Sequence, residues 1–333
     1  MTRSRFAVLG CGSIGKRHIR NLLALGEKEV LGFDPREDRR AEAEALGIAT
    51  TGTLDGVWDA KPEAVLITSP SKLHVATALE AAKRGISMFV EKPVSDVHDP
   101  ELDALVAEAK SKNLVTLVGC NLRFHPGLAN AKRVLDDKRL GRVVSCRAEF
   151  GQYLPDWHPW EDYRKGYSAR KDLGGGVILD AIHELDYVRW LMGDVVSVAA
   201  FAGHLSHIEI DTEDTASILL RFASGAFGEV HLDYVQRTYT RACRIVGDEG
   251  TLAWEFGKAG EVRVFTAATK AWEALPGPAG WEPNTMYVDE MRHFLACLRR
   301  EETPHQDVAA ATAVLDVALA AKASAESGRF VSP

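Results

Sequence analysis

The stretch Gly10-Cys11-Gly12-Ser13-Ile14-Gly15 decides the fold, since it joins an apolar run at Phe6–Leu9 to a helical pattern over residues 14–25. G-x-G-x-x-G between a strand and a helix is typical of dinucleotide binding. The first glycine permits the tight turn, the second lets a pyrophosphate approach the backbone, and the third lets helix and strand pack closely. Ser13 and Ile14 open the helix, whose N–H groups and positive dipole end favour phosphates. We therefore predict a dinucleotide site here.

The end of the second apolar run, Val30–Phe33, predicts which coenzyme binds. Asp34 follows it, and an acidic side chain there accepts the ribose hydroxyl protons and repels a 2′-phosphate, which favours NAD. Arg36, Arg39 and Arg40 come next and leave NADP as the alternative, provided that Asp34 turns away. The alternative is that these arginines lie on the solvent-exposed face of the second helix and bind no coenzyme.

The first 122 residues alternate apolar runs with amphipathic stretches, which is typical of βαβ units on a parallel sheet. The expected strands are Phe6–Leu9, Val30–Phe33, 64–68, Ser87–Val90 and 115–119. Residues 14–25 and 74–84 are expected to be helices that end at Gly26 and Gly85, where glycine suits a left-handed cap. We predict a Rossmann domain over residues 1–122.

From Arg142 the pattern changes to a period of two, with Val144, Cys146, Ala148 and Phe150 on one face. That alternation predicts an antiparallel sheet with one covered face. Further strands are expected at 195–201, 216–222, 226–234, 242–246 and 251–256, and helices at 177–192, 288–299 and Val308–Ser327. The prediction for residues 123–333 is an α+β domain with a large, mostly antiparallel open sheet that binds substrate and forms oligomers.

Composition excludes several classes of function. The net charge of −7 is carried by scattered residues, which argues against nucleic-acid binding. No apolar run approaches the length of roughly 20 residues that spans a bilayer, so we expect no membrane association. The five cysteines are far apart and odd in number, as in a reducing, cytoplasmic compartment. His204, His207 and His231 lack metal-ligand spacing, so we predict no metal site.

Glu91-Lys92-Pro93 follows the strand Ser87–Val90 at the carboxyl edge of the sheet, where open α/β folds bind ligands. A lysine there can direct its ammonium group at a substrate oxygen beside the nicotinamide. Ser69, His74 and Glu91 are further expected contacts of the coenzyme. His74 is explained nearly as well by helix capping and packing.

Several collinear motifs together carry a resemblance to a known family. They are Gly10–Gly15, Glu91-Lys92-Pro93, Asn121-Leu122-Arg123-Phe124-His125-Pro126, Gly174-Gly175-Gly176-x-x-x-Asp180-x-x-His183-x-x-Asp186, Tyr287-x-x-Glu290-x-x-x-Phe294 and a terminal Ser-Gly-Arg-Phe-Val. With them the chain resembles the glucose–fructose oxidoreductase/inositol dehydrogenase/MocA family over nearly its whole length. The resemblance implies a Rossmann domain, an open C-terminal sheet that often forms dimers or tetramers, and hydride transfer at a hydroxyl-bearing carbon.

The resemblance also implies catalytic roles for Lys92 and His183, which meet at the reacting carbon, and for Asp180, which precedes the histidine. Many members separate the Asp and the His by four positions, whereas Asp180 and His183 are three apart. Positions three apart still share a helix face, and Asp186 is a rival partner of His183. Independently of the family, alcohol oxidation needs a base such as histidine, a carboxylate to orient it and a cation beside the developing alkoxide.

The segment from Tyr153 to Tyr167 is long for a connection inside a domain and is expected to bind substrate. Tyr153, Trp157, Trp160, Tyr163 and Tyr167 offer stacking surfaces for sugar rings. Arg164 offers a charged hydrogen-bond donor, and the cations beside the aromatic residues favour an anionic sugar. Arg123 is a further expected substrate contact. The alternative is a loop that covers the sheet or a subunit interface.

Three functions remain open from the sequence. The first is an NAD(P)-dependent dehydrogenase of a sugar, sugar acid, inositol or nucleotide sugar. The second is a glycosidase that retains NAD and cleaves by transient oxidation, with Tyr153 or Asp162 as the extra acid or base. The third is a non-catalytic dinucleotide sensor, against which the pair Lys92 and His183 argues because a sensor needs no proton transfer.

Overall fold

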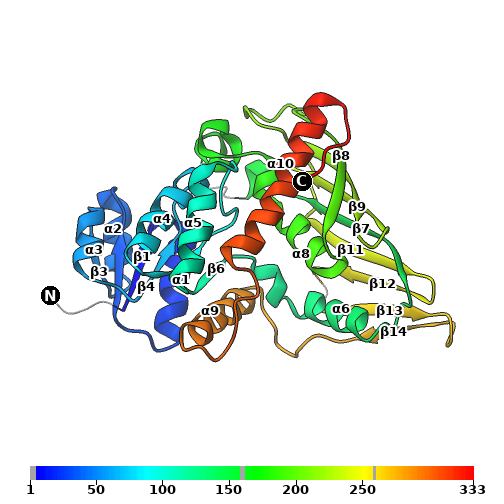
Figure 1. Cartoon of the computed structure of the whole chain (residues 1–333), viewed down its shortest axis with the longest axis horizontal. Coiled ribbons are helices and arrows are strands. Elements are labelled where there is room, and N and C mark those ends of the chain that lie inside the picture. The colour runs from blue at the N-terminus through cyan, green and yellow to red at the C-terminus, as the bar shows by residue number, and fades with distance from the viewer. Residues whose placement is uncertain (1–4, 158–161, 258–259) are drawn as a thin grey trace. The chain divides into compact units, whose positions relative to one another are not determined.

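The chain folds into two compact units in a computed structural model that describes residues 5–157, 162–257 and 260–333 (Figure 1). The first unit comprises residues 1–120 and 287–312, and the second comprises 121–286 and 313–333. The expected boundary at 122/123 lies two residues from the observed one. The segment 287–312, which we assigned to the second domain, packs with the first instead.

The first unit is built on a six-stranded parallel sheet with the order β3-β2-β1-β4-β5-β6. Its strands are β1 (Phe6–Leu9), β2 (Val30–Phe33), β3 (Ala49–Thr51), β4 (Ala64–Ile67), β5 (Ser87–Val90) and β6 (Thr116–Val118). Strands β1 to β3 are added toward one edge of the sheet, and β4 to β6 are added toward the other. The order therefore reverses between β1 and β4, and doubly wound sheets bind ligands at such a switch point. The predicted Rossmann fold is therefore confirmed.

Helices flank this sheet (Figure 1). They are α1 (Ser13–Ala24), α2 (Glu37–Glu44), α3 (Leu54–Asp59), α4 (His74–Lys83), α5 (Pro100–Ser111) and α9 (Asn284–Leu298). The central strands β1 and β4 are buried along their whole length, as strands covered on both faces are. We did not predict β3 and α3, because β3 is three residues long and lies at the partly exposed edge.

The second unit is built on an eight-stranded sheet with the order β14-β13-β12-β11-β7-β10-β9-β8. Its strands are β7 (Val143–Gly151), β8 (Val195–Gly203), β9 (Thr215–Phe222), β10 (Phe227–Asp233), β11 (Thr240–Gly247), β12 (Gly250–Glu255), β13 (Val262–Thr266) and β14 (Ala271–Leu275). Every pair is antiparallel except β7 with β10, so the predicted mostly antiparallel sheet is confirmed. We did not predict β13 and β14.

One face of this sheet is covered by α6 (Pro126–Asp136), α7 (Val177–Asp180) and α8 (Ile182–Met192). Burial alternates along β9, where Ala216, Ile218, Leu220 and Phe222 point inward. The residues 177–192, predicted as one helix, form two, because the chain leaves helical geometry at Ala181 (φ −88°, ψ 29°).

We stated that no apolar run in the sequence approaches the length that spans a bilayer, and helix α10 (Val308–Ser327) shows that this is wrong. It is long and apolar enough to cross a membrane by length and composition. However, 56% of its apolar window is buried inside the fold, as in the core helix of a soluble protein. Its small residues pack closely, and Ala318 and Ala321 are fully buried.

His125 anchors α6 within an aromatic cluster. Its ring centroid lies 5.0 Å from that of Trp254, 5.1 Å from Phe256 and 4.6 Å from Trp281. Its Nδ1 accepts a hydrogen bond from the N–H of Gly127 and so caps the helix. Burial lowers the pKa of His125 from 6.5 to about 4, so the folded state holds it neutral.

We expect His125 to make the stability of the second unit fall as the pH drops from 6.5 to 4. In that range the unfolded chain takes up a proton that the folded chain refuses, at a cost of at most about 3 kcal/mol. Denaturant unfolding followed by tryptophan fluorescence measures this, because six of the seven tryptophans lie beyond residue 120. His125→Asn keeps an oxygen that can cap α6, and it should reduce the change in the free energy of unfolding between pH 6.5 and 4. An unchanged pH dependence in this variant would show that His125 is not its cause.

Candidate active site

The glycine turn at the end of β1 leaves room for backbone only. Gly10 has φ +113°, and a Cβ there would lie 2.8 Å from the carbonyl carbon of Thr68. A Cβ on Gly15 would lie 1.9 Å from the carbonyl oxygen of Gly10. At Gly12, by contrast, the nearest atom would be the Arg39 guanidinium at 3.5 Å. Gly10 and Gly15 thus pack as predicted, and Gly12 presents an open backbone that suits a pyrophosphate.

Helix α1 begins directly behind this turn. Ser13 is exposed, and Gly12 and Ile14 are partly exposed, so the first N–H groups of the helix face outward. The first turn holds no acidic residue that would offset the positive end of the dipole. This local geometry suits an anionic phosphate and needs no side chain to bind it.

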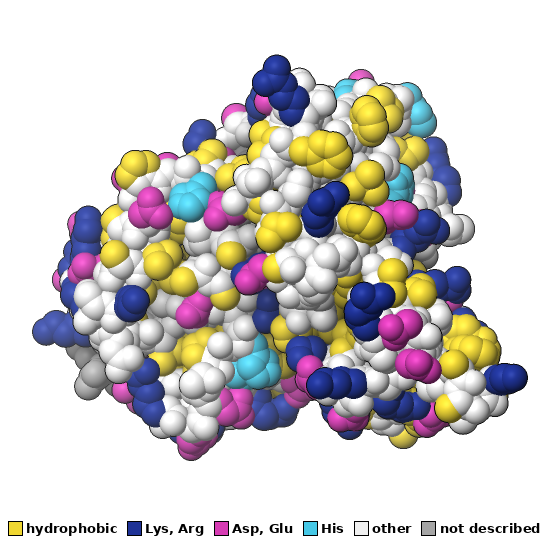
Figure 2. Space-filling view, turned by 45° about the vertical axis from the view of Figure 1, so that its right-hand side comes forward, with side chains coloured by type: hydrophobic (Ala, Val, Ile, Leu, Met, Phe, Trp, Pro, Cys, Tyr) yellow, Lys and Arg dark blue, Asp and Glu magenta, His cyan; other side chains and the backbone are white. Residues whose placement is uncertain are grey.

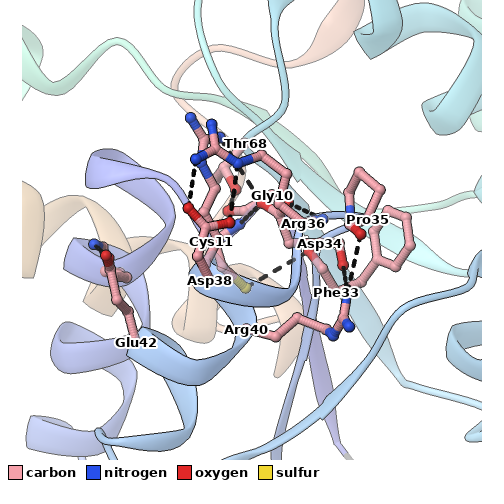
Figure 3. A network of polar contacts seen from close by, with 12 residues as sticks. Gly10, Cys11, Phe33, Asp34, Pro35, Arg36, Asp38, Arg40, Glu42 and Thr68 are labelled. Carbon is pink, nitrogen blue, oxygen red and sulfur yellow. Dashed lines mark hydrogen bonds and ion pairs between the residues drawn. The ribbon is translucent and has the colours of Figure 1, made fainter.

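Asp34 is buried at the end of β2, beside the glycine turn (Figure 3). One carboxylate oxygen accepts the N–H of Cys11 at 2.9 Å, and the other accepts the N–H of Arg36 at 2.9 Å. A carboxylate has about four acceptor positions, so each oxygen can still accept one hydroxyl. Asp34 therefore both fixes the turn and retains capacity for a ribose.

The three arginines after Asp34 differ in their surroundings, and Figure 3 labels two of them, Arg36 and Arg40. Arg36 forms an ion pair with Asp38, and Arg40 donates to the carbonyl oxygen of Asp34 at 2.8 Å. Arg39 lies closest to the glycine turn, with its guanidinium 3.9 Å from an Asp34 carboxylate oxygen. The carboxylate has not turned away from the site, which was our condition for a 2′-phosphate.

Lys92 follows β5 at the same carboxyl edge, and its peptide bond to Pro93 is cis. Its side chain is partly exposed, whereas Glu91 is buried. Parallel strands end at one edge of a sheet, so the glycine turn, Asp34, Ser69 and Lys92 share this edge within the first unit. The arrangement suits a coenzyme that lies across the strand ends beside a cationic side chain.

Glu91 and His74, which we expected at the coenzyme, have buried protein partners. Glu91 lies 2.7 Å from Nε2 of His18, and both ring nitrogens of His74 lie 2.8 Å from backbone carbonyl oxygens, one of them that of Ser69. His74 is 1% exposed. These positions argue against the direct coenzyme contacts that we predicted for the two side chains.

The sequence analysis did not identify His18 as a residue of this site. It lies on the apolar face of α1 next to Ile19 and Leu22, and all three are fully buried. A titratable residue on the apolar face of a helix signals a buried partner, because an unpaired polar group there is costly. That signal was readable, but the partner Glu91 lies 73 residues away.

In the second unit, the three successive glycines 174–176 allow a loop to pack closely against α7. A Cβ on Gly175 would lie 2.1 Å from the carbonyl oxygen of Tyr167, and one on Gly176 would lie 2.4 Å from a Glu213 carboxylate oxygen. Glu213 also accepts the N–H of Ile178 at the start of α7. The glycines therefore bring the loop residues Tyr167 and Ser168 onto the helix.

Asp180 is buried under this loop and accepts three hydroxyl hydrogen bonds. The donors are Tyr167, Ser168 at 2.7 Å and Tyr234 at 3.1 Å. Asp180 is the last residue of α7, and His183 belongs to α8 beyond the break at Ala181. The shared helix face that we expected for the two residues is therefore wrong, because the helix is interrupted between them.

Asp186 and Arg123 bind each other. Nε and Nη2 of Arg123 donate to the two Asp186 oxygens at 2.9 Å and 2.7 Å, and both residues are buried. This bidentate pair holds the guanidinium of Arg123, which we predicted as a substrate contact, against Asp186. Each oxygen of Asp186, which we considered as a rival partner of His183, thus accepts one hydrogen bond from Arg123.

The expected substrate segment is largely engaged with its own domain. Tyr153 lies under Arg237, whose guanidinium is 3.5 Å from the ring centroid, and the Trp157 ring packs against Tyr234 at 5.4 Å. The hydroxyl of Tyr163 accepts the N–H of Glu209. Trp160, another predicted contact, lies outside the described residues.

Two arginines, one in this segment and one just after it, form ion pairs with acidic residues. Arg164 pairs with Asp162 at 2.8 Å and with Glu209 at 2.9 Å, and Arg170 pairs with Asp172. The charges of these two arginines are therefore locally compensated, which weakens the argument for an anionic sugar.

Within residues 5–157, 162–257 and 260–333, no group of three or more His, Cys, Asp or Glu side chains is placed to hold a metal ion. The five cysteines are buried and unbonded to one another. Burial raises the pKa of Cys11, in the glycine turn, to about 11, so it is held as an uncharged thiol.

Comparison with known proteins assigns both units. Residues 4–120 match the model of an oxidoreductase family with an NAD-binding Rossmann fold, and residues 128–253 match the GFO/IDH/MocA C-terminal domain. The chain belongs to the GFO/IDH/MocA oxidoreductase family. It is an NAD-binding oxidoreductase, as the motifs predict.

The similar proteins and the solved structure described next cover between 74% and 99% of this chain. A scyllo-inositol 2-dehydrogenase (NAD(+)) from Bacillus subtilis is 28% identical over 97% of this chain and 94% of its own. A myo-inositol 2-dehydrogenase from Thermotoga maritima is 30% identical over 74% of each chain. The structure of levoglucosan dehydrogenase in complex with NADH superposes with a TM-score of 0.89 over 99% of this chain and 98% of that one, at 23% identity.

Replacement of Asp34 tests its place at the ribose. Asp34→Ala should reduce the preference for NADH over NADPH about ten- to a hundredfold, since hydrogen bonds to a charged group contribute about 1.5–3 kcal/mol. Dissociation constants from coenzyme fluorescence measure this. Asp34→Asn is the matched control, because it keeps an acceptor oxygen for the turn and loses the charge. An unchanged preference in Asp34→Ala would show that Asp34 does not contact the ribose.

Proposed function

We propose that the protein is a dehydrogenase that transfers hydride between NAD and a hydroxyl-bearing carbon of a sugar or cyclic polyol. The observation that carries the proposal is the common edge of the first sheet, where the open Gly12 backbone, Asp34 and Lys92 lie at the ends of β1, β2 and β5. The relatives named for inositols and levoglucosan support the substrate class.

The chain's own residues suit the coenzyme and the chemistry around it. Gly10, Gly12, Gly15 and the N–H groups of Ser13 and Ile14 would hold the pyrophosphate, and Asp34 would hold the ribose. Nicotinamide, when bound, supplies the hydride acceptor. Lys92, an ammonium group on a flexible stem, stabilises negative charge on the substrate oxygen.

His183 is the proposed base for the hydroxyl proton, since a neutral imidazole takes a proton near neutral pH. Asp180 is the proposed carboxylate that supports the histidine. Its three hydroxyl donors hold it in one orientation, which suits a group whose task is to stabilise a neighbouring imidazolium. Tyr153, Trp157 and Tyr163 remain proposed stacking surfaces for the sugar ring.

Neutral polyols are expected ahead of anionic sugars. Arg164 and Arg170 are already paired with acidic residues, so binding an anion there would require breaking an ion pair. Inositols and anhydrosugars are therefore the first compounds to test, with sugar acids as the comparison.

A screen of such compounds with NAD and NADP, read at the absorbance band of reduced nicotinamide, tests the proposal. We expect turnover with a neutral cyclic polyol and NAD. Lys92→Ala should reduce turnover by about 10² to 10³, as loss of a group that stabilises an oxyanion does. His183→Ala should reduce it by about 10² to 10⁴, as loss of a general base does, and both variants should retain NADH binding. Turnover unaltered by Lys92→Ala would remove that lysine from the mechanism.

The alternatives predict different results in the same screen. A glycosidase that retains NAD would cleave glycosides in an NAD-dependent way without net NADH formation. A sensor would bind NADH and turn over no compound. Either pattern would contradict the dehydrogenase.

The uncovered face of the eight-stranded sheet is the proposed oligomer interface, with a second copy of this chain as its occupant. Leu219, Phe227 and Trp272 are about half exposed on it. Hydrophobic and charged side chains are interspersed on the right-hand side of the surface in Figure 2. The ion pair of Arg147 with Glu229 lies on the same face and offers both signs of charge to a two-fold partner.

Light scattering on a sizing column tests the interface. We expect the unaltered protein to be a dimer or tetramer, and Leu219→Glu to shift it toward the monomer because a buried charge without a partner is costly. Leu54→Glu, at the start of α3 in the first unit, is the control, since it makes the same substitution at another exposed leucine. A monomeric parent protein would contradict the proposed interface.

A further inference from the structure

Two buried histidines flank Lys92 through its neighbours in the chain. His18, on α1, is 0% exposed, and His74, the first residue of α4, is 1% exposed. His18 contacts Glu91, the residue before the lysine, and His74 contacts Pro93, the residue after it. Both histidines belong to the first unit, as does Lys92.

His18 reaches the backbone of Lys92 through Glu91. Its Nε2 lies 2.7 Å from one carboxylate oxygen of Glu91, and the other oxygen accepts the N–H of Lys92 at 3.2 Å. Gly119 makes room for this carboxylate, because a Cβ there would lie 3.2 Å from the second oxygen. The imidazole is held in place by the edges of Phe89 and Tyr287, at centroid distances of 4.9 Å and 6.4 Å.

The Glu91 carboxylate is charged within this buried site. Burial raises its pKa, but the hydrogen bond and charge of His18, with the charge of Lys92, outweigh burial, so the pKa lies below its usual value. A charged group in a low-dielectric site interacts strongly with its partners. Glu91 thus lies within hydrogen-bond distance of His18 on α1 with one oxygen and accepts the N–H of Lys92 with the other.

His74 ties together the two loops that end at this edge. Its Nδ1 lies 2.8 Å from the carbonyl oxygen of Pro93, after β5, and its Nε2 lies 2.8 Å from that of Ser69, after β4. Carbonyl oxygens only accept hydrogen bonds, and burial lowers the pKa of His74 and so favours the neutral ring, which carries a single N–H. The ring therefore donates to one of the two carbonyl oxygens and lies against the other across the strand ends. Ser69 in turn abuts Gly10, since a Cβ on that glycine would lie 2.9 Å from the Ser69 nitrogen.

We propose that His18 and His74 are positioning residues that fix the backbone of Lys92 from both sides. Through His18, the helix that receives the pyrophosphate is coupled to the catalytic lysine. The inference rests on the proposed role of Lys92. Its physical basis is that a misplacement of about 1 Å in a reacting group reduces turnover about a hundredfold.

Matched variants of His74 separate its two contacts. His74→Asn places an amide nitrogen where Nδ1 lies and can donate to Pro93, whereas His74→Gln places one where Nε2 lies and can donate to Ser69. We expect His74→Asn to retain at least about tenfold more kcat than His74→Gln, with similar unfolding temperatures. A kcat in His74→Gln equal to or above that of His74→Asn would overturn the role of His74.

Matched variants of His18 test the other side. His18→Gln keeps a donor for Glu91, whereas His18→Leu removes it. The expected kcat of His18→Leu is about a hundredfold below the parent, and that of His18→Gln is within about tenfold, with little change in KM for the polyol. Equal kcat in the two variants would overturn the role of His18.

A double-mutant cycle with Lys92→Ala shows whether the histidines act through the lysine. In the Lys92→Ala background, His18→Leu and His74→Gln should cause little further loss of kcat, because the group that they position is gone. Additive losses would assign both histidines a merely structural role. NADH dissociation constants and unfolding temperatures, measured for every variant, report on folding and coenzyme binding separately.

The cycle also distinguishes the failure of the inference from that of the proposed function. Full turnover in Lys92→Ala would refute the role of the lysine itself, and with it the premise. A large loss in Lys92→Ala together with additive losses in the double variants would refute the positioning alone.

Discussion

The crossing of α1 over the ends of β1 and β4 is the constraint on which the site depends. A side chain at Gly15 would lie 1.9 Å from the Gly10 carbonyl oxygen, so only glycine allows the helix to start this close to the sheet. That closeness lets the N–H of Cys11 reach Asp34 and seats His18 beside Glu91. The same contact thus shapes the proposed phosphate and ribose positions and the support beneath Lys92.

The second unit uses the same device at its own functional helix. Gly175 and Gly176 have no room for a side chain, so their loop packs closely against α7. In this position Tyr167 and Ser168 donate hydrogen bonds to Asp180. The helix breaks at Ala181, immediately after that carboxylate. In both units glycine permits a close backbone approach, and the approach orients a buried carboxylate beside the residues proposed for chemistry.

Local patterns were enough to predict the fold class and the coenzyme, because glycine spacing, strand burial and Asp34 express themselves within a few residues. Partners distant in sequence were not predictable. Glu91 finds His18 across 73 residues, and Arg123 finds Asp186 across 63. The sequence also did not indicate that residues 287–312 belong to the first unit, because residues 121–286 of the second unit separate them from it along the chain. Strand β3 has only three residues and β14 is exposed along most of its length, so neither carries a clear burial pattern. Strand β13 was missed although its Val262 and Val264 are buried and alternate with Arg263.

The measurement that tests the central claim most directly follows the hydrogen itself. The polyol with the fastest turnover, carrying deuterium at its reacting carbon, is incubated with NAD, and the reduced coenzyme is analysed by mass spectrometry. Direct hydride transfer predicts that one deuterium per turnover appears in the nicotinamide ring, with a primary isotope effect on turnover. Deuterium found in the solvent instead, with none in the coenzyme, would contradict the assignment of this protein as a dehydrogenase.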